Sequence, residues 1–133
     1  MATQNDSIFG DEIIHSYTRA QALEDGVLVD VSTTAREAGI TFPLAVTARV
    51  WSDLVTPDPR AVAWGQSVEG RLWDLMSMLR FTIRASRGGG QVLYFRCIFV
   101  LKERQRRTVT LKAVCGPGDD AEPTITVMFP EED

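Results

Sequence analysis

The chain has 133 residues, 44% of them hydrophobic and 24% charged, a length and composition typical of one compact domain. No apolar run approaches the roughly 18 residues of a membrane span, and the N-terminus lacks the basic and apolar regions of a signal peptide. We therefore expect a soluble, cytoplasmic protein. The net charge of −4 is unevenly spread, because residues 80–112 carry nine Arg or Lys and one acid. Such a basic segment can contact nucleic acid or an acidic protein, or simply keep an exposed face solvated.

The N-terminal region predicts a short capped helix behind a flexible arm. Residues 1–10 are polar and predict a disordered arm, followed by a single domain over residues 11–133. Thr18 and Gln21 stand three residues apart, as in a capping box, and Gly26 lies where a left-handed C-cap belongs.

The next elements are less regular. Alternating valines predict a strand over 27–32. Thr34 and Glu37 have the spacing of a second capping box, at the start of a helix of one or two turns. Apolar residues at helical spacing over 43–54, with a proline in the first turn, predict another helix. Two prolines and a glycine predict a loop over 56–66.

The second half predicts one long helix and three strands. The stripe that identifies the helix over 67–86 consists of Leu72, Leu75, Met76, Leu79 and Ile83. Strands follow at 91–103, 108–115 and 124–129. The expected fold class is α+β: a single domain with short N-terminal helices and one strand, and a long amphipathic helix packed on a C-terminal antiparallel β-meander.

The inventory of reactive residues excludes several chemistries. His15 is the one histidine, which rules out multi-histidine metal sites, and no Cys-x-x-Cys spacing or phosphate-binding glycine loop is present. We expect neither a metal nor a cofactor. Cys97 and Cys115 both fall on inward faces of predicted strands, and in a reducing compartment they should be free thiols.

The segment "HSYTR" gathers the candidates for a catalytic role. His15 could act as an acid or base beside Tyr17, with Arg19 holding a phosphate near a helix N-terminus. Alternatively Thr18 caps the helix, Tyr17 packs and Arg19 pairs with a neighbour.

The segment "CGPGDD" at 115–120 suggests a metal-binding loop, a phosphate-binding loop or an ordinary turn that connects two strands. Its acids are too few for a calcium cage made by protein alone. We therefore predict a connection in which Gly116 and Gly118 supply positive φ. Asp119 and Asp120 should be solvated.

The basic segment supplies candidate partner-binding residues. A cluster at a predicted hairpin tip comprises Lys102, Arg104, Arg106 and Arg107. Arg96 and Lys112 are expected on the outward face of the strands beside Tyr94.

Three stretches resemble a known family: "IIHSYTRAQALEDGVLVDVS", "RLWDLMSMLRFTIRASRGG" and "VTLKAVCGPGDDAEPTITVMFPEED". Over residues 13–133 the chain resembles a family of short bacterial proteins that is known only as a domain of unknown function. The resemblance implies a bacterial cytoplasmic protein, often encoded on plasmids, prophages or integrative elements. It implies no reaction and no site residues.

Three functions remain open. The first is a non-enzymatic accessory protein of a mobile element, whose partner is a macromolecule, more readily a protein than a nucleic acid. The second is a nucleic-acid binder that uses the basic segment 80–112. The third is a small enzyme centred on His15, Tyr17 and Arg19. The oligomeric state is open in all three.

Overall fold

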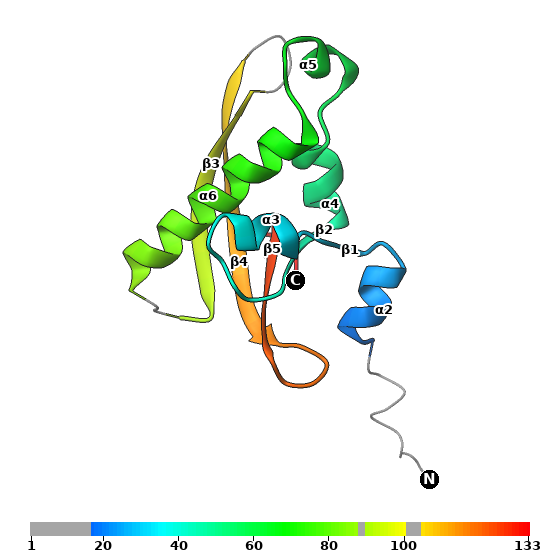
Figure 1. Cartoon of the computed structure of the whole chain (residues 1–133), viewed down its shortest axis with the longest axis vertical. Coiled ribbons are helices and arrows are strands. Elements are labelled where there is room, and N and C mark those ends of the chain that lie inside the picture. Colours follow the sequence, from blue (N-terminus) through cyan, green and yellow to red (C-terminus); the bar gives the residue numbers. More distant parts are fainter. Residues whose placement is uncertain (1–16, 88–89, 101–104) are drawn as a thin grey trace.

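The computed structural model describes residues 17–87, 90–100 and 105–133. Within them, five strands form one sheet in the order β1-β2-β5-β4-β3. The helix α6 (Val68–Ser86) runs across one face of this sheet (Figure 1). The single-domain α+β class that the sequence predicts is therefore confirmed. The predicted arm at 1–10 lies outside the described residues.

The three C-terminal strands form the predicted antiparallel meander. These are β3 (Val92–Val100), β4 (Arg106–Pro117) and β5 (Pro123–Met128). Side chains of a strand alternate between the two faces of its sheet. On β3 this alternation buries Phe95, Cys97 and Phe99 against α6, and Cys97 is thus on the inward face that the sequence predicts.

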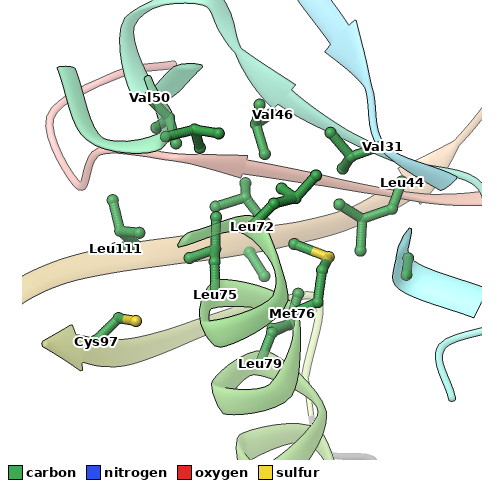
Figure 2. Close-up of a cluster of buried hydrophobic side chains, with 14 of the residues drawn as sticks. Val31, Leu44, Val46, Val50, Leu72, Leu75, Met76, Leu79, Cys97 and Leu111 are labelled. Carbon is green, nitrogen blue, oxygen red and sulfur yellow. The ribbon is translucent and has the colours of Figure 1, made fainter. Parts of the chain in front are cut away.

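The core lies between α6 and the sheet. Ser67 caps α6 by accepting a hydrogen bond from the Gly70 N–H, so the helix begins where the sequence predicts. Figure 2 shows the helix side chains pointing toward aliphatic residues of the strands. The buried residues of α6 that form this contact are the predicted Leu72, Leu75, Met76 and Leu79. Ile83 is partly buried against the same cluster.

The segment predicted as a helix from residue 43 is wrong in its first part. Leu44–Thr47 forms β2, which pairs antiparallel with β1 (Leu28–Asp30) and parallel with β5. Because β2 is internal, Leu44, Ala45 and Val46 are all apolar and buried. A short apolar run of this kind does not distinguish strand from helix. The helix begins only at α4 (Ala48–Val50) and continues as the π-helical segment η1 (Trp51–Val55).

Two other local predictions are also wrong. The helix α3 (Ser32–Glu37) begins before Thr34, so the predicted second capping box does not form. The hydroxyl of Ser32 instead accepts from the Leu44 N–H at 3.0 Å and donates to Asp30. The predicted loop contains α5 (Pro59–Ala63), because Asp58 caps it and proline is well suited to the first helical position.

Candidate interaction surface

Among the described residues the first helix is α2 (Arg19–Glu24), which begins at the last residue of "HSYTR" and has Thr18 as its N-cap. The predicted capping box is present: Thr18 Oγ1 accepts from the Gln21 N–H at 3.0 Å, and Gln21 Oε1 accepts from the Thr18 N–H at 2.9 Å. Tyr17 donates from its hydroxyl to Asp25 Oδ2 at 2.7 Å, and this hydrogen bond raises the pKa of the phenol. His15 lies outside the described residues.

Arg19 attaches α2 to the outer face of β5. Its guanidinium donates to Thr126 Oγ1 at 2.7 Å and to the Ile125 carbonyl at 2.9 Å. Burial lowers the pKa of Arg19, while Asp30, Asp119 and Glu122 oppose that shift. Both terminal guanidinium nitrogens, Nη1 and Nη2, donate within the fold, which agrees with the alternative that Arg19 pairs with a neighbour. No described contact brings Arg19 together with Tyr17 in a catalytic arrangement.

Asp119 is an important residue that the sequence reasoning missed. Its carboxylate accepts from the Arg19 N–H at 2.8 Å and from the Ala20 N–H at 3.0 Å. The expectation that this acid is merely solvated is therefore wrong. Its partners are 99 and 100 residues away along the chain, so no local sequence signal could have identified them.

The glycines of the same loop also depart from expectation. Neither Gly116 nor Gly118 has a positive φ, whereas Ala121 has φ 66°. A Cβ at Gly118 would lie 2.6 Å from the carboxyl carbon of Glu122. The absence of a side chain at Gly118 therefore leaves space for the Glu122 carboxylate. The prediction of a connection between strands is confirmed, since β4 ends at Pro117 and β5 begins at Pro123.

Only two of the four residues of the predicted basic cluster are described by the structure. Lys102 and Arg104 lie outside the described residues. Arg106 and Arg107 belong to β4, opposite Val100 and Phe99, so they are in a strand and point to opposite faces of the sheet. Arg107 lines a cleft of about 310 Å³ that also contains Asp53 and Asp58. Arg96 and Lys112 lie on the outward face with Tyr94, as predicted.

Exposed apolar side chains gather around α6 and β3. Ten large hydrophobic side chains are exposed in the described part of the chain, and six of them belong to these two elements. We call this group the α6–β3 surface: Trp73, Met78 and Phe81 on α6, and Val92, Tyr94 and Ile98 on β3. The most exposed are Phe81 at 68% and Tyr94 at 60%.

A cleft connects the two halves of the α6–β3 surface. It has a volume of about 620 Å³ and is lined by Trp73 and Met78 from α6, and by Arg96 and Ile98 from β3. Asp74 also lines it. The surface therefore combines aromatic, aliphatic and cationic side chains around the edge of the sheet.

The β3 strand is the last in the strand order of the described residues. An edge strand has backbone N–H and C=O groups that point away from its neighbour and can pair with another chain. Natural proteins often protect such edges with charged residues. Over Val92–Val100 the one charged residue is Arg96, so this edge is predominantly apolar.

The two thiols are too far apart for an intrachain disulfide. Cys97 lies opposite Val109, six positions before Cys115 on β4, which is about 20 Å along a strand. Cα atoms more than about 7 Å apart cannot be joined without moving the backbone. Burial, with a smaller contribution from Asp74, raises the pKa of Cys97 to about 11. Cys115 is only half-buried.

The described residues contain neither a cluster of metal ligands nor a membrane-spanning helix. No three His, Cys, Asp or Glu side chains among residues 17–87, 90–100 and 105–133 are arranged to hold a metal ion. In the same ranges, no helix has the length and apolar character needed to cross a membrane.

These observations define a single-domain α+β protein whose candidate site is an exposed apolar and basic surface at a sheet edge. The chain belongs to the DUF6573 family, a family of unknown function that matches residues 4–133. No curated protein and no solved structure matches the chain. The predicted resemblance is confirmed as membership in a family of unknown function.

Proposed function

We propose that this protein is a cytoplasmic, non-enzymatic accessory protein of a bacterial mobile element, and that it binds another protein through the α6–β3 surface. The observation that carries the proposal is the concentration of exposed hydrophobic side chains on α6 and β3. The bacterial and mobile-element part of the proposal rests on the family resemblance of the three quoted stretches.

The composition of the surface favours a protein partner. Exposed apolar patches are typical of interaction sites, and one cleft brings Trp73 and Met78 of α6 together with Ile98 of β3. Aromatic residues and arginine dominate the binding energy of protein interfaces. Trp73, Phe81, Tyr94 and Arg96 supply both types. The cations Arg96 and Lys112, on the outward face beside Tyr94, favour a partner with an acidic rim.

Co-purification from the native host tests this proposal. We expect the tagged protein to retain a defined partner after nuclease treatment, and the Phe81→Ser/Tyr94→Ser variant to lose it. The matched control is Val27→Ser/Val62→Ser, which removes two hydrophobic side chains of 50% and 55% exposure outside the surface. The proposal is wrong if the surface variant, shown to be folded by circular dichroism, retains the partner as well as the control does.

Nucleic-acid binding is a second candidate, favoured by charge. The described residues within 80–112 include seven Arg or Lys and no acid. If they contact phosphates, the logarithm of affinity should fall by roughly one unit per contact for each tenfold increase in salt. Arg96→Ala/Arg106→Ala should reduce that slope by about two, whereas Arg36→Ala, on α3, should not change it. Absence of binding to DNA and RNA at low salt would eliminate this candidate.

A further inference from the structure

A cavity lies beside the C-terminal half of α6, apart from the α6–β3 surface. It is partly open, has a volume of about 450 Å³ and is lined by α6, by the segment 39–42 and by the three C-terminal strands. Pockets for small organic ligands have volumes of roughly 300–1,000 Å³. The cavity is therefore large enough for a small organic molecule.

The interior of the cavity is mainly apolar. Side chains from three parts of the fold contribute to it: Ile40, Phe42, Ile83, Leu93, Ala113 and Ile125. At about 30 Å³ for each water-sized group, the volume corresponds to roughly fifteen such groups. An apolar body of about ten non-hydrogen atoms would fit within this space.

Two arginines line the same cavity. Arg80 and Arg84 are one helical turn apart on α6, both are exposed, and neither side chain has a hydrogen-bond or ion-pair partner among the described residues. Glu37 shares a neighbouring groove with them without bonding to either. Two unpaired guanidinium groups can bind one carboxylate or phosphate through several charge-assisted hydrogen bonds.

Gly39 allows Arg80 to take this position. A Cβ at Gly39 would lie 2.6 Å from Arg80 Nε, closer than non-bonded atoms approach. The backbone there has φ 99°, a region that favours glycine. The guanidinium therefore lies close to Gly39, at the edge of the apolar cavity that both residues line.

We propose that this cavity binds an organic anion with an apolar body, such as a medium-chain carboxylate. Arg80 and Arg84 bind the anionic group, and the apolar body occupies the space between Ile83, Leu93 and Ile125. This activity is independent of the proposed partner binding, because it uses a different set of residues.

Cys115 provides a reporter within the cavity. It lines the space and is half-buried, whereas Cys97 is buried in the core with a pKa of about 11. At pH 8 only about one Cys97 thiol in a thousand is ionised, so iodoacetamide should modify Cys115 first. A molecule bound in the cavity should protect Cys115 from alkylation.

The experiment uses decanoate, below the concentration at which it forms micelles, as the probe. Binding is measured by calorimetry, and alkylation of each cysteine in the folded protein is followed by mass spectrometry. We expect decanoate to bind and to slow Cys115 alkylation at least fivefold. Acetate, which lacks the apolar body, and 1-decanol, which lacks the charge, should bind at least tenfold more weakly.

Matched variants test whether the two arginines of the cavity bind the anionic group. Arg80→Gln/Arg84→Gln should weaken decanoate binding at least tenfold. Arg36→Gln/Arg87→Gln removes the same charge from two exposed arginines outside the cavity and should change affinity less than twofold. Equal effects of the two variants, equal binding of decanol, or no protection of Cys115 would each overturn the proposal.

Discussion

At the residue scale, every backbone N–H at the start of α2 has an acceptor. Gln21 Oε1 accepts from the Thr18 N–H, and Thr18 Oγ1 accepts from the Gln21 N–H. The carboxylate of Asp119 accepts from the N–H groups of the two residues between them. Helix N-termini favour negative charge and leave N–H groups that need partners outside the helix. Asp119 meets both requirements and attaches the β4–β5 loop to α2.

Asp119→Ala should therefore destabilise the protein by about 1–2 kcal/mol, the usual effect of losing an N-terminal cap. The Asn variant should lose less, because its amide oxygen can still accept from one N–H group. Asp120→Ala is the matched control and should stay within about 0.5 kcal/mol of wild type. Urea unfolding followed by circular dichroism measures all three, and equal losses at 119 and 120 would contradict this account.

Sequence alone identified the capping box of α2 but not the contribution of Asp119. The three-residue spacing of Thr18 and Gln21 is a local pattern, and it predicted the cap correctly. Asp119 carries no comparable signal, because an aspartate in a Gly-rich turn is ordinarily solvated. Its role depends on the sheet bringing α2 to the loop.

At the element scale, α6 contains one buried cation. Arg71 has an exposed fraction of 4% and donates to the Leu54 carbonyl at 3.0 Å and to the Val100 carbonyl at 2.6 Å. A third hydrogen bond, at 3.3 Å, goes to Gln66 Oε1. Burial lowers the pKa of Arg71, with Asp58 opposing the shift. The side chain thus connects α6 to η1 and to the end of β3.

We expect Arg71→Ala to lower the free energy of unfolding by about 2–4 kcal/mol, because it leaves buried carbonyl oxygens without a donor. Arg84→Ala, the same substitution at an exposed position of α6, should change it by less than about 0.5 kcal/mol. Chemical denaturation compares the two. A similar small effect at both positions would show that water replaces Arg71 without cost.

The helix α6 and the meander were predictable because each carries its own periodicity. The stripe at Leu72, Leu75, Met76 and Leu79 repeats every three or four residues, and the inward face of β3 alternates strictly. β2 was not predictable in this way. Leu44, Ala45 and Val46 are all buried, so neither period is visible in them.

At the scale of the whole molecule, the two halves of the chain share one sheet. β2, from the N-terminal half, pairs in parallel with β5, with Leu44 opposite Ile125, and the Ile125 N–H donates to the Pro43 carbonyl at 2.9 Å. The sequence predicted a C-terminal meander and only one N-terminal strand. The additional strand places Leu44 and Val46 in the same core as α6 (Figure 2).

The protein should consequently unfold in one cooperative transition. Tryptophan fluorescence, from Trp51, Trp64 and Trp73, and far-ultraviolet circular dichroism should give coincident urea curves. The shared core makes separate unfolding of either half costly. Two resolved midpoints would show that β2 and β5 do not couple the halves.

The sequence by itself determined the α+β class, the long helix, the three C-terminal strands, the first capped helix and the family. Each of these rests on a local spacing or on a long matching segment. Tertiary structure alone decided that β2 joins the sheet and that Asp119 caps α2. It also brought Arg80, Arg84 and Cys115 to one cavity. These features depend on contacts between residues far apart in the chain, which no local period of apolar residues encodes.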